Sequence, residues 1–205
     1  MSWQRRKTAP KVRDGRVQRK NNWRPTPDNY GQPQVSIARL RPGRGYRHVL
    51  RCADVYTFVH LLPDWDSLKT SLNQILLVAG SNTIQGWFRP GKVAVCALPS
   101  NLELVFHRDF FARDGAFLDR LRVPYEFFPE EKTQVRCWLT PATARCFLLM
   151  RVLVHELGHH HDRITNPKGW CSRGEAFAER YERIVEEQVW SRYLAVFGDP
   201  RVRTT

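Results

Sequence analysis

The sequence lacks paired cysteines. Its five cysteines stand singly along 205 residues and no CxxC occurs, which argues against a cysteine-rich zinc knuckle. An odd number of cysteines at scattered spacings favours free thiols in a reducing compartment.

Long apolar runs are also lacking. The longest, residues 146–154, is short and contains Arg151, so we expect no membrane-spanning segment and no membrane partner. The first ten residues, MSWQRRKTAP, carry positive charge but no apolar stretch after it, so we expect no secretory signal. Together these absences predict a cytoplasmic protein.

Acidic residues are scarce at the start of the chain. Residues 1–50 contain thirteen of the 33 Lys and Arg but only two of the 20 Asp and Glu, so they carry +11 of the total charge of +13. Residues 1–47 are also poor in aliphatic side chains, and such a segment cannot bury enough apolar surface to offset its ordering entropy. We therefore predict a disordered basic tail over residues 1–47 and one domain over residues 48–205. The tail is either a solvated segment or an arm for nucleic acid.

Hydrophobic periodicity predicts both helices and short strands in residues 48–205, and hence an α+β fold with a small sheet. The expected helices cover residues 52–62, 66–76, 108–123, 140–164 and 172–197. The expected strands cover residues 83–88, 92–98 and 135–139. One of the last two strands is expected to form a sheet edge to which an extended peptide can pair.

The helix expected over residues 140–164 carries the sequence His155-Glu-Leu-Gly-His159. Residues four apart lie on one face of a helix, so the two imidazoles can bind one metal ion from the same side. Glu156 is rotated by about 100° from His155, which places it near the metal without making it a ligand. A general base that activates water belongs at such a position. The apolar residues before the motif predict a buried helix, and Gly158 indicates that another segment approaches closely.

A third protein ligand is expected, because catalytic zinc usually has three. The last helix offers Glu175 and Glu179, of which Glu175 lies nearer its apolar stripe. Glu175 is thus the favoured ligand and Glu179 its supporting neighbour or the alternative ligand. Glu175 also fits a capping box with Ser172. Asp162, one turn after His159, is expected to accept a hydrogen bond from a ligand imidazole.

These two segments resemble those of the gluzincin zinc metallopeptidases, in particular the members related to anthrax lethal factor. There HExxHxxD is followed by an ExFAE helix whose first Glu binds the metal, and residues 155–162 and 175–179 match both patterns. The resemblance covers about residues 147–185. It implies a zincin-like fold, one Zn²⁺ ion bound by His155, His159 and Glu175, Glu156 as the general base, and hydrolysis of peptide bonds.

The chain departs from that group in two respects. The spacing from His159 to Glu175 is short, whereas the spacing to Glu179 is close to that of thermolysin, so Glu179 stays the alternative ligand. Those peptidases also place a Tyr shortly before the third ligand, to stabilise the oxyanion, and this chain has none there. Tyr181 and His160 are the candidate oxyanion donors that remain.

The sequence therefore predicts a zinc metallopeptidase that acts on a protein or peptide substrate. The alternative is a nucleic-acid-associated protein that uses residues 1–47 and has a structural or vestigial zinc site. Cys171 is the conceivable fourth ligand of such a closed site. A DNA-tethered, SprT-like protease would combine the two functions.

Overall fold

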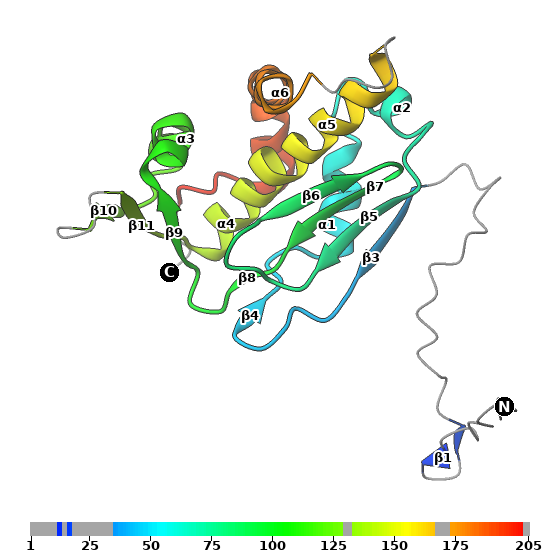
Figure 1. Cartoon of the computed structure of the whole chain (residues 1–205), viewed down its shortest axis with the longest axis horizontal. Helices are drawn as coiled ribbons and strands as arrows, with labels where there is room; N and C mark the ends of the chain where they lie inside the picture. Colours follow the sequence, from blue (N-terminus) through cyan, green and yellow to red (C-terminus); the bar gives the residue numbers. More distant parts are fainter. Residues whose placement is uncertain (1–11, 14–15, 18–34, 129–132, 167–172, 203–205) are drawn as a thin grey trace, which may run out of the picture. The chain divides into compact units, whose positions relative to one another are not determined.

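The computed structural model describes residues 12–13, 16–17, 35–128, 133–166 and 173–202 (Figure 1). The chain divides into two units, residues 1–32 and residues 33–205. In the first unit, the described residues form one short antiparallel pair, β1 (Val12–Arg13) and β2 (Arg16–Val17). Most of the predicted tail lies outside the described residues.

A four-stranded sheet forms one part of the second unit. Its strand order is β3, β5, β7, β6, in which the first three are parallel and β6 is antiparallel to β7. The strands are β3 (Ser36–Arg39), β5 (Gln74–Val78), β6 (Gly86–Arg89) and β7 (Lys92–Cys96). The expected hairpin at residues 83–98 is confirmed as β6 and β7.

The predicted domain boundary at residue 48 is too late. Strand β3 supplies an edge of the sheet, and its Ile37 packs against the core. Charged residues surround β3 in the sequence, and its parallel pairing with β5 depends on residues about 38 positions away.

A smaller antiparallel sheet has the strand order β10, β11, β9. Its strands are β9 (Glu103–His107), β10 (Tyr125–Phe127) and β11 (Gln134–Trp138). A separate short pair joins β4 (Tyr46–Arg47) to β8 (Leu98–Pro99). The predicted edge strands are wrong, because β7 and β11 each lie between two partners. The edges near the histidine motif are β6 and β9.

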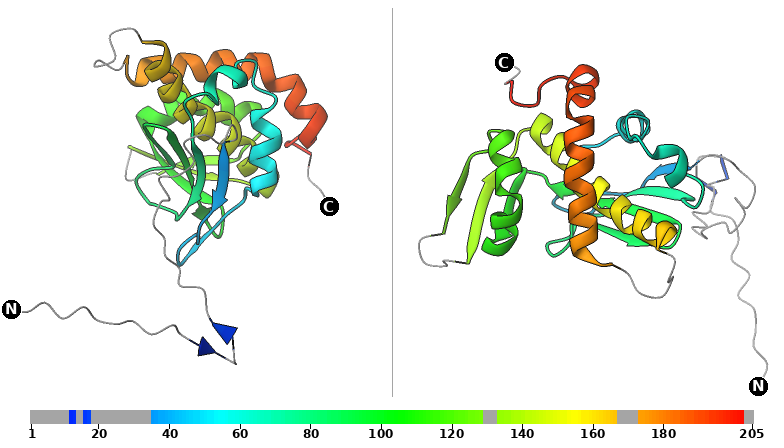
Figure 2. Two further views of the ribbon diagram at one scale, coloured as in Figure 1. Left: turned by 90° about the vertical axis from the view of Figure 1, so that its right-hand side faces the viewer. Right: turned by 90° about the horizontal axis from the view of Figure 1, so that it is seen from above.

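Helices complete the second unit and confirm the α+β class. They are α1 (Cys52–Val59), α2 (Trp65–Leu68), α3 (Arg108–Arg120), α4 (Pro141–Phe147), α5 (Val154–Thr165) and α6 (Glu175–Phe197), with a π-helical segment η1 (Leu148–Leu153) between α4 and α5. Helix α5 lies along β6 and β7 and packs against α6 (Figures 1 and 2). Among the described residues, no helix combines the length and the apolar character that crossing a bilayer requires.

The helix predicted over residues 66–76 is wrong. Helix α2 ends at Leu68, and Ile75 and Leu76 lie in the buried strand β5. A continuous apolar run of this length fits a buried parallel strand or a buried helix equally well by periodicity.

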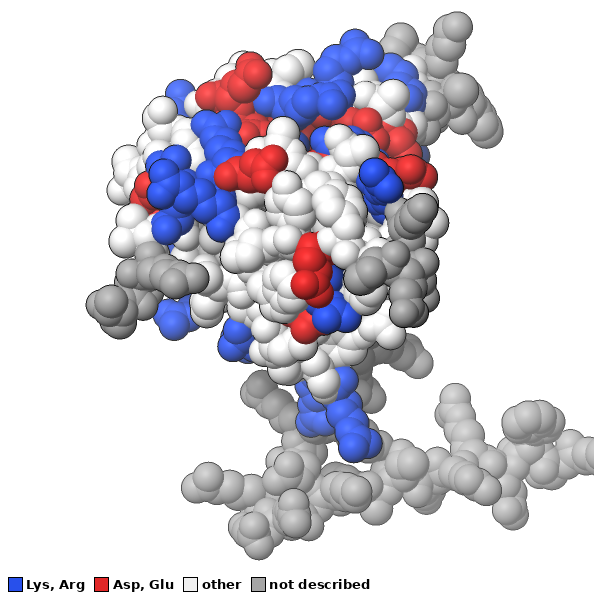
Figure 3. Space-filling model, turned by 90° about the vertical axis from the view of Figure 1, so that its left-hand side faces the viewer, with Lys and Arg blue, Asp and Glu red and all other residues white. Residues whose placement is uncertain are grey.

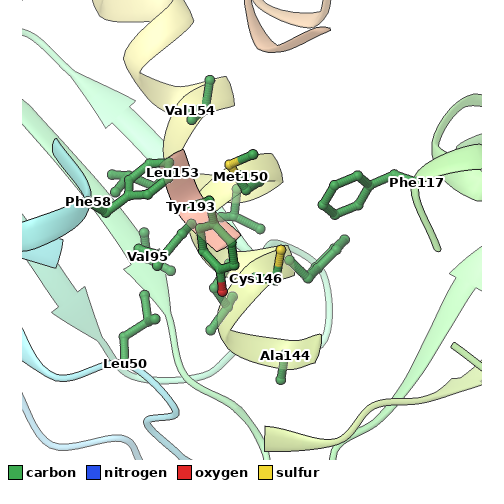
Figure 4. Packing of buried hydrophobic residues seen from close by; sticks show 14 of the residues in the cluster. Leu50, Phe58, Val95, Phe117, Ala144, Cys146, Met150, Leu153, Val154 and Tyr193 are labelled. Atoms are coloured by element: carbon green, nitrogen blue, oxygen red, sulfur yellow. The ribbon is translucent and has the colours of Figure 1, made fainter. Parts of the chain in front are cut away.

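The helix predicted over residues 140–164 is confirmed, although η1 interrupts its α-helical geometry. Thr140 caps its start by accepting a hydrogen bond from the Thr143 amide at 3.1 Å. Figure 4 shows that side chains from four other elements gather around this helix: Phe58 of α1, Val95 of β7, Phe117 of α3 and Tyr193 of α6. The helix that carries the histidine motif is therefore fixed in the core.

Candidate metal centre

Helix α5 presents His155 and His159 on one face, and both side chains are more than four-fifths buried. Helix α6 comes close to α5 at Gly158, where a Cβ atom would lie 3.0 Å from the Ala178 Cα. The close approach expected at Gly158 is thus confirmed, since a larger residue would separate the two helices. This contact brings the start of α6 to the histidines.

Glu175 meets both histidines. Its Oε2 lies 3.0 Å from His155 Nε2 and its Oε1 lies 3.4 Å from His159 Nε2. One ligand atom from each of the three residues can be chosen so that all lie within 4.8 Å of one another. Ligands of a tetrahedral zinc ion at bond lengths of about 2.0–2.2 Å stand roughly 3.4 Å apart. The three residues could therefore hold a metal ion with little movement.

Glu175 is the first residue of α6, after Gly174. Gly174 has a φ of 72°, in the left-handed region that favours glycine. The predicted capping box with Ser172 does not fit, because it requires Glu175 at the third helical position. The carboxylate is left free to turn toward α5, and its side chain is 70% exposed, so one side of the group of three is open.

Four carboxylates lie along one face of α6, and the last three form ion pairs with arginines. They are Glu175, Glu179, Glu182 and Glu186. Glu179 accepts a hydrogen bond from Arg113 at 2.8 Å, and Arg151 pairs with both Glu182 and Glu186. Glu175 is the first of the four and faces the histidines. The group that could hold a metal ion contains Glu175 and not Glu179.

Glu182 is a residue of the site that the sequence analysis missed. Its Oε2 lies 3.2 Å from His155 Nδ1. Burial lowers the pKa of His155, but the hydrogen bond and charge of Glu182, together with the charges of Glu156 and Glu175, outweigh it, so the pKa of His155 is raised. Glu182 lies seven residues after Glu175, which is two helical turns along the same face, and this spacing could have revealed it.

Asp162 is buried at the other end of the motif. It accepts hydrogen bonds from the Arg173 amide at 2.6 Å and from Arg173 Nε at 2.5 Å, and so ties α5 to the residues just before α6. Burial and the charge of His155 lower the pKa of His159, while Glu175 and Asp162 act in the opposite direction. The hydrogen bond that Asp162 is expected to accept from an imidazole stays a prediction.

Glu156 is buried beside the group of three. Burial raises the pKa of Glu156 to about 7; the charge of Glu175 adds to this shift and that of His155 opposes it. Strand β6 runs against this carboxylate, because a Cβ atom on Gly86 would lie 2.8 Å from Glu156 Oε1. A carboxyl group that titrates near neutrality can both accept and return a proton.

A cavity of about 1000 Å³ opens over these groups. Its lining includes His155, Glu156, His159 and Glu175, together with residues 81–88 on the β6 side and 103–107 of β9. Phe88 of β6 stacks on His159, with 6.4 Å between the ring centroids. Away from the histidines, the lining includes the apolar residues Leu104, Phe106, Phe110 and Phe147 and also charged residues such as Arg113 and Asp114.

The two predicted oxyanion donors face elsewhere. The Tyr181 hydroxyl donates to Asp64 Oδ2 at 2.8 Å, and His160 Nε2 lies 3.0 Å from the Leu68 carbonyl oxygen. Neither side chain is among those that line the cavity. The proposed oxyanion role of each residue stays a prediction, and in this structure their polar atoms face Asp64 and Leu68. Cys171, the conceivable fourth ligand, lies outside the described residues.

Comparisons of the chain with protein-family models, curated proteins and solved structures found no match. The possible metal site of His155, His159 and Glu175 therefore stands on its own geometry.

Proposed function

We propose that this protein is a zinc-dependent peptidase of gluzincin type, with a zincin-like fold. The observation that carries the proposal is the meeting of His155, His159 and Glu175 at 3.0 and 3.4 Å beside the buried carboxyl of Glu156. In this proposal the first three residues hold one Zn²⁺ ion and Glu156 is the general base.

A bound zinc ion supplies Lewis acidity, which polarises a carbonyl group and makes water a stronger acid. Glu156 takes a proton from the attacking water and returns it to the departing amine. Burial of Glu156, which raises its pKa to about 7, would oppose the lowering of that pKa by a bound metal ion and so favours the return of the proton. A positive ion nearby would shift that pKa back toward lower values.

The free edge of β6 is where an extended substrate would pair. Among the described strands, β6 has β7 as its one partner, so its other side offers unpaired backbone groups. Because Gly86 brings β6 against Glu156, a peptide on this edge would place its backbone next to the base. The edge of β6 thus takes the role that the sequence analysis gave to residues 92–98 or 135–139.

The test is metal analysis combined with a peptidase assay on the full chain. The wild type should contain about one zinc ion per chain and cleave peptides. Glu156→Gln should keep the zinc and lose cleavage, because it keeps the shape of the side chain but removes its basicity. A folded wild-type chain that binds no zinc would exclude the proposal.

The alternative function is binding of nucleic acid by the basic segment, which the charge of residues 1–50 favours. On the face of the second unit seen in Figure 3, Lys and Arg are interspersed with Asp and Glu, and they form no continuous basic patch there. We therefore assign such binding to the basic segment, in which residues 1–32 carry nine Lys and Arg and two Asp.

Replacing those nine residues by Gln in the full chain separates the two functions. Loss of DNA or RNA binding with cleavage retained would make the segment a tether of a peptidase. Nucleic-acid binding without cleavage in the wild type would favour the alternative.

A further inference from the structure

We propose that Glu182 is a positioning residue of the metal centre, which fixes the tautomer and the orientation of the His155 imidazole. The inference rests on the proposed zinc site and adds a residue outside the two motifs. Its basis is the contact between Glu182 Oε2 and His155 Nδ1 at 3.2 Å, on the far side of the ring from the Nε2 that faces Glu175.

Both oxygens of Glu182 have a partner. Oε2 faces His155, while Oε1 accepts a hydrogen bond from Arg151 Nη1. The carboxylate is only 7% exposed, so water competes little for either oxygen. With both oxygens engaged, the carboxylate is held in one orientation.

Arg151 is held in turn by a buried charge network. Its Nη2 donates to Glu186 Oε2 at 2.5 Å, and the other oxygen of Glu186 accepts from Arg120 Nη1 at 2.6 Å. The Arg151 guanidinium also lies over the Phe117 ring, 4.2 Å from its centroid. Two carboxylates and two guanidinium groups balance in charge, and this network connects α3, η1 and α6.

The position of Arg151 explains why one carboxylate serves both side chains. Arg151 lies in η1, four residues before His155, so the two side chains leave the continuous helix on roughly the same side. Helix α6 runs past that side and inserts Glu182 between them.

The chemical consequence concerns the proton on the His155 ring. A neutral imidazole carries its proton on one nitrogen, and the carboxylate of Glu182 favours the tautomer with the proton on Nδ1. The lone pair then lies on Nε2, which is the atom directed at Glu175 and at a metal bound there. Carboxylates that accept from a ligand histidine also raise its basicity, and their loss costs about 10–100-fold in metal affinity or activity.

A purely structural role for Glu182, as the counter-charge of Arg151, is the competing explanation. Glu186 offers a matched control, because it also lies on α6, is about as buried and pairs with the same arginine. The ion pairs of Glu186 in the described part of the chain are with Arg151 and Arg120 and include no histidine. A structural role predicts the same result for both residues, whereas a positioning role does not.

The experiment compares Glu182→Gln with Glu186→Gln in the full chain. Zinc affinity is measured by competition with a chelator, zinc release by stopped flow, and the melting temperature on the metal-free protein. We expect similar falls in melting temperature, because each variant removes one buried charge. We expect a loss of zinc affinity of about 10–100-fold, with faster release, for Glu182→Gln alone.

Glu182→Asp keeps the test decisive if Glu182→Gln does not fold. It keeps the charge beside Arg151 but shortens the side chain by one methylene group, so the contact with His155 is lost and zinc affinity should again fall. If the wild type binds zinc and the variants at residues 182 and 186 have equal zinc affinities, the positioning role of Glu182 is overturned. The proposed zinc site itself would stand. A wild type without zinc affinity would overturn both this inference and the proposed function.

Discussion

The two faces of α5 contain the same kinds of side chain but differ in what they can do. The cavity face carries His155, Glu156 and His159, and the α2 face carries His160 and His161. On the cavity face, two imidazole nitrogens converge on Glu175, and the group stays open on one side. On the α2 face, each histidine has a separate environment.

The α2 face is closed by packing and by hydrogen bonds. His160 is 1% exposed and bonded to the Leu68 carbonyl oxygen, and His161 stacks on Phe177 and Tyr181. Burial lowers the pKa of both histidines, which favours their neutral forms. Four histidines within seven residues thus divide into two residues of the possible metal site and two packing residues. The difference lies in the convergence of ligand atoms on an open space, and not in the local density of histidine.

The largest expected difference is between two variants, each of which replaces one histidine on one face of α5. His159→Ala removes a ligand atom, so the purified protein should lose its zinc and its peptidase activity. His161→Phe keeps the ring that stacks on Phe177 and Tyr181, so zinc content should stay near one ion per chain. Metal analysis after dialysis, with circular dichroism to confirm folding, measures the difference. Equal zinc contents in the two variants would contradict the assignment of zinc binding to the cavity face alone.

A second pair of variants compares the effects of two α6 carboxylates on zinc affinity. Glu175→Gln should weaken zinc binding by more than the roughly 100-fold that loss of a supporting carboxylate can cost. Glu179→Gln loses a pair with the partly exposed Arg113, which is worth at most about 1 kcal/mol of stability, and should leave zinc affinity unchanged. Chelator competition on both variants decides between them. The reverse order would make Glu179 the third ligand, in line with its thermolysin-like spacing.

What the sequence could predict about the cavity face follows from local geometry. The spacing of His155 and His159 fixes their common face on any helix, and Gly158 indicates a helix contact that the structure places at Ala178. The helix boundaries near Pro141 and before Asn166 follow from capping and from the residues that end helices. These features depend on residues a few positions apart.

The parts that the sequence could not predict depend on distant pairs. Strand β9 lines the cavity but pairs with β11, about thirty residues later, and its short alternating pattern is weak by itself. The spacing of seven residues places Glu182 on the same face of α6 as Glu175, but its contact with His155 also requires the crossing of α5 and α6 to be known. The hydrogen bond of Tyr181 could not be predicted for the same reason, because its partner Asp64 lies 117 residues away in sequence.

The smallest expected effect tests the predicted oxyanion role of Tyr181, on the α2 face. Tyr181→Phe removes the hydroxyl that donates to Asp64 but keeps the ring that stacks on His161. Losing one such hydrogen bond should lower the free energy of unfolding by about 1 kcal/mol, measured by urea denaturation. Since the hydroxyl is directed away from the cavity, kcat/KM should equal that of the wild type, with Glu156→Gln as the inactive reference. Loss of an oxyanion donor usually lowers kcat/KM by about 100-fold or more. A fall of that size would indicate that Tyr181 lies at the cavity face during catalysis. Such a result would mean that α5 and α6 rearrange when a substrate binds, and that the two faces are less separate than their packing indicates.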